Sequence, residues 1–311
     1  MAATVGIVLL ALTLAVSVDA AVLVLRVDRF PIPATTSAAP GETWVLVGTD
    51  SREHRPPGRD IYYDGGLPGA IGERADIILV LRLEADGSTQ VVSVPRDMVL
   101  PRTVDGGHER VAVALEQGEA ELVHALCAGL GIPTDHLVKV TLRGFVEAVD
   151  ALGGLTLDFE HSTRDYYSFL EPTGAGSQTL DGEAALAFVR SRHPEYLIDG
   201  KWRETGLDEG NAYRASNAAT TVAALQRSAQ DALSDPIRLQ RAAWAVSGGF
   251  QVDEQTSLWS LAQLARASAG ANMITLPGAT TGSELALLAD QTTYDAVSAA
   301  GYTPGSCQVV P

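Results

Sequence analysis

Three apolar runs, each ending in charged residues, constrain the fold of this chain most strongly. Trp44 to Val47 is typical of a buried strand, and residues 77–83 and 90–94 form two further apolar runs. An Ala85-Asp86-Gly87 turn joins the second run to the third, which predicts a hairpin. Because consecutive strands usually lie side by side, we expect the three runs to pair antiparallel in chain order.

Helical and extended patterns alternate through the rest of the chain, and no repeat of fixed period occurs. We therefore expect one α/β domain in which helices cover a mixed central sheet, with residues 251–311 completing it. Asp181 is a candidate N-cap for one of the helices. The expected helices cover residues 112–130, 145–152, 182–189 and about 208–233, and the expected strands cover residues 138–142, 155–159 and 273–276.

The N-terminal stretch from Val5 to Leu25 is almost entirely apolar and long enough to cross a membrane. Arg26 and Arg29 follow it and no basic residue precedes it, which reverses the usual positive-inside bias. A cleaved signal peptide is the alternative. We predict a transmembrane anchor with its flank over residues 1–30, a linker rich in Pro, Ala, Ser and Thr over 31–42, and an extracytoplasmic domain over 43–311, attached to the cell membrane by one span.

The charge of the chain limits its partners. A formal net charge of −16 argues against nucleic-acid binding, which needs a basic surface. Lys139 and Lys201 are the only lysines, so nearly all the positive charge is arginine, whose planar fork suits phosphate. Cys127 and Cys307 are the only cysteines; one disulfide and an unpaired buried Cys127 are both compatible with the sequence.

Antiparallel pairing of the first three strands would bring three charged clusters to one edge of the sheet. Carboxylates that hold Mg²⁺ beside arginines that bind phosphate are what phosphoryl transfer needs. The alternative is that each cluster forms ordinary surface ion pairs. The residues concerned are Asp50, Ser51 and Arg52 after the first strand, Arg74 and Asp76 before the second, and Arg96 and Asp97 after the third.

A second group of charged residues lies in the middle of the chain. Arg190 and Arg192 follow a predicted helix, and two residues apart in extended chain they point to the same side. Asp208 is a candidate cap for the next helix, whose N-terminus favours an anion. On that helix Asn211 and Arg214 share a face.

These clusters resemble, in order and approximate spacing, the motifs of the LytR-CpsA-Psr family. Each motif is short, but five in order between about Trp44 and Leu233 make the resemblance specific. The matching segments are Gly48-Thr49-Asp50-Ser51-Arg52, Arg74-Ala75-Asp76, Ser93-Val94-Pro95-Arg96-Asp97, the Gly-Gly turn at residues 149–154, and residues 180–186 followed by Arg190-Ser191-Arg192.

The resemblance implies an extracytoplasmic α/β domain with an apolar tunnel for a polyprenyl chain. The implied activity is transfer of a glycopolymer from a polyprenyl-pyrophosphate carrier to peptidoglycan. Asp50 and Asp76 would bind Mg²⁺ (or Mn²⁺), and Asp76, Arg96 and Asp97 would be catalytic, with Asp76 or Asp97 as the base. The phosphate-binding residues implied are Arg52, Arg74, Arg96, Arg190, Arg192, Asn211 and Arg214.

Three positions depart from the family pattern. Asn211 stands where the motif has an arginine, Ala215 where it has a glutamine, and Ala112 where it has an asparagine. Loss of an arginine that acts in the transition state can cost orders of magnitude in rate. Two alternatives therefore stand beside the transferase: a catalytically impaired scaffold that binds lipid-linked glycan, and a polyprenyl pyrophosphatase that uses water as acceptor.

Overall fold

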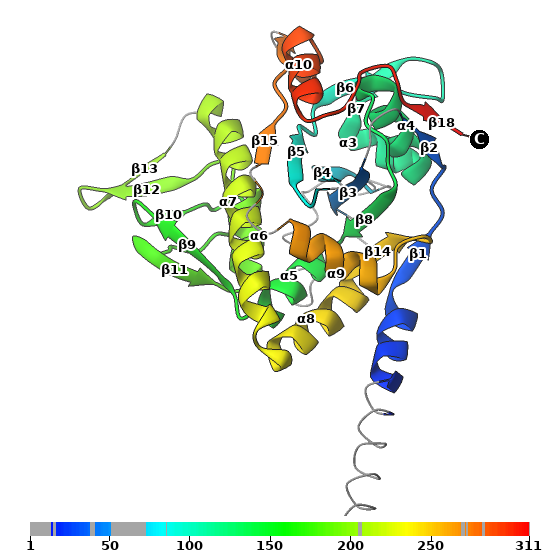
Figure 1. Cartoon of the computed structure of the whole chain (residues 1–311). Helices are drawn as coiled ribbons and strands as arrows, with labels where there is room; N and C mark the ends of the chain where they lie inside the picture. Colours follow the sequence, from blue (N-terminus) through cyan, green and yellow to red (C-terminus); the bar gives the residue numbers. More distant parts are fainter. Residues whose placement is uncertain are drawn as a thin grey trace, which may run out of the picture.

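The computed structural model describes residue 14 and residues 17–37, 41–50, 73–84, 86–204, 207–268, 271, 273–281 and 284–310. At its centre lies a mixed sheet of seven strands (Figure 1). In spatial order these strands are β1 (Asp28–Phe30), β14 (Phe250–Asp253), β8 (His136–Val140), β3 (Glu42–Thr49), β4 (Ala75–Leu83), β5 (Thr89–Val94) and β15 (Met273–Thr275). As predicted, β3, β4 and β5 pair antiparallel in chain order, whereas β8 joins β3 in parallel.

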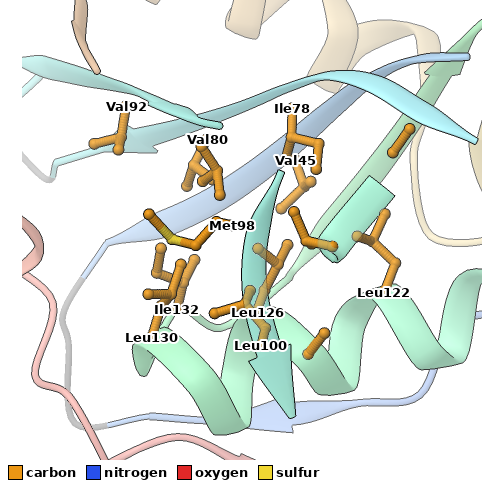
Figure 2. Packing of buried hydrophobic residues seen from close by; sticks show 14 of the residues in the cluster. Val45, Ile78, Val80, Val92, Met98, Leu100, Leu122, Leu126, Leu130 and Ile132 are labelled. Atoms are coloured by element: carbon orange, nitrogen blue, oxygen red, sulfur yellow. The ribbon is translucent and has the colours of Figure 1, made fainter. Parts of the chain in front are cut away.

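One face of the sheet packs against α4 (Glu119–Leu130), as Figure 2 shows. Side chains alternate between the two faces of a strand, so Ile78 and Val80 of β4 point to this face. They meet Leu122 and Leu126 of the helix in a core from which water is excluded. This packing anchors the middle strands and fixes where their charged ends lie.

The opposite face of the sheet is covered by α9 (Leu258–Ala267) and part of α7 (Leu207–Leu233). Leu79 and Leu81 of β4 pack there with Leu264 of α9. The domain is thus a helix–sheet–helix sandwich, which confirms the predicted α/β class.

The helix predicted over residues 112–130 is divided in the structure. It consists of α3 (Val111–Ala114), a 3₁₀ turn at Leu115–Gln117 and then α4. Gly118 lies between them with φ of 108°, a conformation that the α-helix cannot accommodate and that glycine adopts readily. The prediction of one continuous helix was wrong because it overlooked this glycine.

Smaller elements complete the fold around the sandwich. The ribbon β9–β11 and the sheet β10–β12–β13 lie on the side of α7 away from the central sheet (Figure 1). The helices are α5 (Leu142–Ala151), α6 (Gly182–Arg190), α8 (Pro236–Gly249) and α10 (Gln291–Ala299). The strands are β2 (Thr35–Thr36), β6 (Met98–Pro101), β7 (His108–Arg110), β9 (Leu155–Phe159), β10 (Thr163–Arg164), β11 (Gly176–Leu180), β12 (Glu195–Ile198), β13 (Lys201–Glu204), β16 (Ala279–Thr281), β17 (Glu284–Leu288) and β18 (Gln308–Val309).

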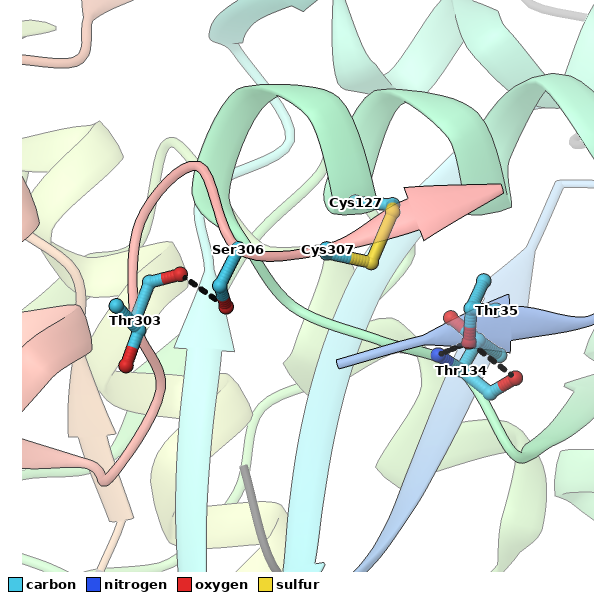
Figure 3. The surroundings of a disulfide bond; sticks show 6 residues. All are labelled: Thr35, Cys127, Thr134, Thr303, Ser306 and Cys307. Carbon is cyan, nitrogen blue, oxygen red and sulfur yellow. Dashed lines mark hydrogen bonds between the residues drawn. A yellow bond between two sulfur atoms is a disulfide. The ribbon is translucent and has the colours of Figure 1, made fainter. Parts of the chain in front are cut away.

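A disulfide ties the C-terminal segment to the body of the domain. Cys127 on α4 is bonded to Cys307, 180 residues away, beside the pairing of β2 with β18 (Figure 3). Of the two states that the sequence left open, the structure has the disulfide. Such bonds persist in oxidising compartments outside the cytoplasm.

The N-terminal segment contributes to the fold as well. The predicted span from Val5 to Leu25 falls largely outside the described residues, although residues 17–26 are helical. No helix in the described part of the chain has both the length and the hydropathy needed to cross a membrane. Within the stretch expected to be anchor flank and linker, β1 joins the central sheet and β2 pairs with β18.

A buried histidine, the first residue of β8, predicts that the stability of the protein depends on pH. The ring of His136 stacks on Trp44, and its Nδ1 lies 2.7 Å from Thr256 Oγ1 and 3.3 Å from Asp253 Oδ2. Burial lowers the pKa of His136, but the hydrogen bond and charge of Asp253, with Glu42, outweigh it, so the pKa lies above its ordinary value of 6.5.

Because the folded protein holds this proton more tightly than the unfolded chain, the contribution of His136 is complete below pH 6.5 and is lost as pH rises through the folded pKa. We expect the urea concentration at the midpoint of unfolding to decrease as the pH is raised from 6 to 8. His136→Phe, which keeps a ring against Trp44, should flatten this dependence. An unchanged slope in the variant would assign the pH effect to another group.

Candidate functional site

The three charged clusters meet at one edge of the central sheet, as the strand order predicts. Asp50 follows β3, and its Oδ1 accepts a hydrogen bond of 2.7 Å from the backbone N–H of Arg74, just before β4. The backbone N–H of Asp50 donates in return to the carbonyl of Arg74 at 3.2 Å. Asp50 is thereby held beside the first residues of β4.

Asp76 occupies a β-bulge, which explains its position. Gly48 of β3 pairs with Ile77 and Thr49 pairs with Ala75, so Asp76 is the extra residue of β4 between these two pairs. Bulges bend a strand and redirect a side chain, and they are frequent beside active sites. Here the bulge places Asp76 on the wall of a cavity of about 220 Å³.

Arg96 and Asp97 complete this edge from the turn after β5. Arg96 donates to Asp76 Oδ1, and its Nε lies 3.6 Å from Asp97 Oδ1. Arg110 approaches the same oxygen of Asp97 at 3.8 Å. The three residues predicted as catalytic, Asp76, Arg96 and Asp97, therefore form one partly exposed charged cluster.

Arg74 has a partner that the sequence did not suggest. Its Nε donates to Glu116 Oε1 at 2.5 Å, and this hydrogen bond raises the pKa of Arg74 above its ordinary value. Half of its side chain is exposed. Arg74 lies at the predicted edge, and a phosphate there would compete with Glu116 for its guanidinium.

Arg190 and Arg192 reach this edge from the C-terminus of α6. Burial lowers the pKa of Arg192, and the positive charges of Arg96 and Arg190 lower it further, while Asp76 and Asp97 offset them only in part. The second predicted cluster thus lies beside the first. The positive charges of Arg96 and Arg190 act on Arg192 at close range, and three guanidinium groups gathered in one place stabilise a bound anion.

An apolar cavity of about 220 Å³ begins at this charged edge. Asp76 and Arg190 are its charged lining residues, and the rest of its wall comes from β3, β4, β8, α5, α6, α7 and the start of β14. Such a wall excludes water and suits a hydrocarbon. Its apolar side chains include Leu46, Ile77, Leu79, Val140, Phe145, Leu186, Val189, Val222, Leu225 and Phe250.

Three buried polar atoms at this site have no hydrogen-bond partner among the described residues. They are the hydroxyls of Thr49 and Thr221, which line the cavity, and Nε of Arg96. Buried polar groups are almost always paired, and a bound ligand or ordered water is the usual explanation for an exception. The site therefore has the composition of a ligand-binding site: an apolar interior, a few polar groups and cations at the mouth.

Asp165 is the residue that sequence reasoning missed. It is fully buried, and its Oδ2 accepts from Ser191 Oγ at 2.6 Å and from the backbone N–H groups of Arg192 at 3.0 Å and His193 at 2.9 Å. Its Oδ1 accepts from the backbone N–H of Tyr167 at 2.9 Å. Asp165 thus fixes the segment that carries Arg190 and Arg192, although nothing in its local sequence distinguishes it from a turn aspartate.

We expect Asp165→Asn to impair both folding and anion binding. An amide directs N–H groups at some of these donors, leaving buried groups unpaired, so stability should fall by about 2–4 kcal/mol. Once Arg192 is no longer fixed, the affinity for inorganic pyrophosphate should fall about ten-fold. Urea unfolding and calorimetric titration measure the two effects, and Asp158→Asn, at an exposed position of β9, is the matched control. Lower stability with unchanged affinity would give Asp165 a structural role only.

Several predicted residues lie where the structure gives no side-chain information. Arg52 is outside the described residues. Asn211, Arg214 and Ala215 lie on α7, but their side chains are outside the described set. The helix begins at Leu207, which places Asp208 in its first turn. Ala112 is described: it is buried, and its backbone N–H donates to the carbonyl of Arg96 at 3.0 Å.

The carboxylates at this edge fit a divalent cation only with help from a ligand. Among the described residues, no three His, Cys, Asp or Glu side chains lie close enough together to hold a metal ion. Asp50 and Asp76 provide two carboxylates at the same end of the β3–β4 ladder, since Asp50 follows Thr49 and Asp76 follows its partner Ala75. Mg²⁺ is commonly bound by one or two carboxylates with phosphate oxygens and water, so this pair suits an ion that arrives with a phosphate substrate.

The comparison with known families decides where this chain belongs. The sequence profile of the LytR_cpsA_psr family matches residues 33–290. The chain belongs to this family. The matched residues include every cluster described above.

The names of two relatives of this LytR-CpsA-Psr chain connect them with the cell wall. The chain is 32% identical over 250 residues to the probable cell wall biosynthesis protein LcpB of Corynebacterium glutamicum, covering 79% of this chain and 56% of that protein. It is 32% identical over 122 residues to the polyisoprenyl-teichoic acid–peptidoglycan teichoic acid transferase TagU of Bacillus subtilis, covering 38% and 39%. The chain spans about half the length, or less, of these curated relatives.

A solved structure confirms the fold. The structure described as a LytR-Csp2A-Psr enzyme from Actinomyces oris superposes with a TM-score of 0.77 at 31% identity, covering 92% of this chain and 99% of that one. The mixed central sheet covered by helices is therefore the fold of this LytR-CpsA-Psr relative as well.

Proposed function

We propose that this protein transfers a glycopolymer, together with its proximal phosphate, from a polyprenyl-pyrophosphate carrier to a sugar hydroxyl of peptidoglycan. The observation that carries the proposal is the apolar cavity that begins at Asp76 and Arg190. The site has an apolar interior and arginines at its mouth, and a lipid pyrophosphate has a hydrocarbon chain and a polyanionic head that match these two parts. The family membership and the name of TagU support this activity class.

The side chains at the cavity mouth have distinct roles in the proposed reaction. Arg96, Arg190 and Arg192 bind the pyrophosphate and stabilise the charge that develops on its oxygens, assisted by Arg74 and by Arg214 and Arg52 from their segments. Asp50 and Asp76 would hold Mg²⁺ (or Mn²⁺), which neutralises phosphate charge when it is bound. Asn211 is the residue of α7 that would take the place of the missing arginine.

The chemical step forms one bond and breaks one. The acceptor hydroxyl oxygen attacks the phosphorus attached to the glycopolymer, the bridging P–O bond breaks, and the lipid monophosphate leaves with its electron pair. Asp76 or Asp97 accepts the hydroxyl proton as the general base. Both carboxylates lie within the Arg96 cluster, so the base and the phosphate-binding groups are held together.

The proposal extends to the place where the protein acts. Residues 1–30 would anchor the chain in the cell membrane, with the folded domain on the extracytoplasmic side, where lipid carrier and peptidoglycan meet. The Cys127–Cys307 disulfide supports this side of the membrane, since the cytoplasm keeps thiols reduced.

Product analysis tests the activity. Full-length protein in detergent micelles is incubated with Mg²⁺ and a polyprenyl-pyrophosphate-linked glycan, with and without peptidoglycan fragments. We expect lipid monophosphate to be released, and glycan phosphate to appear on the acceptor, when the acceptor is present. Release without acceptor would make the protein a pyrophosphatase, and lipid binding without any product would make it a scaffold.

The departures on α7 give a further expectation. If Asn211 and Ala215 weaken catalysis, then Asn211→Arg with Ala215→Gln should raise turnover by about ten-fold or more, because an added guanidinium stabilises transition-state charge. The rate of lipid monophosphate release measures this. A double variant no faster than the wild type would mean that the native residues already complete the site.

A further inference from the structure

A short loop beside the arginine segment presents two tyrosines to solvent. Asp165 and Leu170 exchange two backbone hydrogen bonds of 3.0 Å, which closes the loop between them. Tyr166 is 68% exposed and Tyr167 is 80% exposed. Phe169 adopts φ of 63°, an unfavourable value for a residue with a bulky side chain. The fold thus maintains a strained loop, pinned by the buried Asp165, whose tip is aromatic.

The two tyrosine rings of this loop contact side chains of neighbouring segments. The Arg164 guanidinium lies 4.9 Å from the centroid of the Tyr166 ring and 4.2 Å from that of Trp202 on β13. Arg164 also donates to Glu195 at 2.6 Å, so its charge is neutralised. On the other side, Tyr167 lies 5.0 Å from the ring of His193, the residue after Arg192.

A hollow of about 160 Å³ lies beside the loop, and its charges indicate what it can bind. Glu171 is on its wall, and Arg164 on the same wall is paired with Glu195. Among the described residues of this wall the arginine is already paired and Glu171 is negatively charged, so the wall does not favour binding of an anion. The lining residues are Arg164, Asp165, Tyr166, Phe169, Leu170, Glu171 and Pro172.

We propose that this tyrosine surface, formed by Tyr166, Tyr167, Trp202 and His193, binds the glycan strand of the acceptor. The inference rests on the proposed transferase function. Sugar rings have an apolar C–H face that packs on aromatic rings and a hydroxyl edge that needs polar groups, and this surface has both. The Tyr167 ring lies beside the ring of His193, and His193 directly follows Arg192 in the chain. A sugar that packs on Tyr167 would therefore lie near the segment that carries Arg190 and Arg192.

The charge of the surface favours the acceptor over the donor. A glycopolymer that arrives on a pyrophosphate carries its negative charge into the arginine cluster, whereas the hollow beside the tyrosine surface has Glu171 on its wall and its arginine, Arg164, paired with Glu195. A neutral part of a glycan strand is the chemistry that it accommodates. The surface would hold the attacking hydroxyl beside the arginine segment, through the contact of Tyr167 with His193.

The test uses the double variant Tyr166→Ala with Tyr167→Ala in the full chain. Its binding to a soluble peptidoglycan glycan oligomer is measured by calorimetric titration, and its KM is measured separately for donor and acceptor. We expect the Kd for the oligomer and the acceptor KM to rise about ten-fold or more, since two stacking contacts are lost. The donor KM should not change. The Phe double variant should retain binding, because it keeps the rings.

Trp259→Ala is the matched control, since Trp259 is 64% exposed on α9 and lies outside the tyrosine surface. An alanine double variant that binds the oligomer like the wild type would overturn the inference, as would a wild type that does not bind it. If donor turnover persists in either case, the proposed function stands. If the wild type binds the oligomer through the tyrosines but never releases lipid monophosphate, the transferase proposal fails and the glycan site stands.

Discussion

Turnover of the lipid-linked donor should fall by about 100-fold or more when Asp76 or Arg96 is replaced by alanine. Arg96 donates to Asp76 and its Nε lies 3.6 Å from Asp97 Oδ1, so its guanidinium lies between the two candidate bases. Asp76 stands on a bulge at the cavity wall and serves as a candidate base and metal ligand. Each variant therefore removes a group that acts on the reacting phosphate.

The comparison variant for this prediction is Arg143→Ala. Arg143 is an exposed arginine on α5 that pairs with Glu147 at 2.6 Å, four residues along the same helix. A surface pair of this kind contributes little to stability, so the control should leave turnover unchanged. Initial rates of lipid monophosphate release measure all three variants, and Asp76→Ala or Arg96→Ala with near-native rates would place the chemistry elsewhere.

The second large effect is expected from filling the cavity. Ala148 on α5 lines it and is buried, so Ala148→Phe would place a ring where the hydrocarbon chain is proposed to lie. Each methylene that cannot be buried costs about 0.8 kcal/mol, and two displaced groups already reduce affinity by about ten-fold. We expect at least this loss for a long-chain polyprenyl pyrophosphate.

Binding of inorganic pyrophosphate provides the internal control for this variant, because it needs the charged mouth and not the cavity. Its affinity for Ala148→Phe should equal that of the wild type. Arg143→Phe adds the same ring at an exposed position of the same helix and should change neither affinity. Calorimetric titration gives both constants, and undiminished binding of the long-chain lipid would show that its chain does not occupy the cavity.

The charged edge of the sheet was predictable because it depends only on strand order. Apolar runs and one tight turn fix the antiparallel order of β3, β4 and β5, and antiparallel order brings Asp50, Asp76 and Arg96 to the same end. The approach of Arg190 and Arg192 to this edge was not derivable in the same way. It depends on how α6 packs against α5 and α7, which the sequence pattern of α6 does not specify.

The cavity and the role of Asp165 could not be predicted from one sequence. Leu46, Ile77 and Leu225 have the apolar character that any core position requires, and only the packing of helices against the sheet leaves a space between them. Asp165 accepts hydrogen bonds from the Ser191 hydroxyl and from the backbone N–H groups of Arg192 and His193, 26 to 28 residues away, and a sequence does not show which backbone groups a distant side chain will contact. The division of the helix at Gly118 shows the converse, since that glycine was visible and its effect was overlooked.

Occupation of the apolar cavity by the lipid chain is tested by photo-crosslinking of the full chain with a polyprenyl pyrophosphate that carries a photoreactive group on its hydrocarbon chain. Peptide mapping by mass spectrometry then locates the label. We predict labelling of the cavity-lining segments of α5, α6 and α7, competition by unlabelled lipid, and loss of the label in Ala148→Phe. Labelling confined to outer surfaces such as α8 and α9, and unaffected by Ala148→Phe, would contradict it.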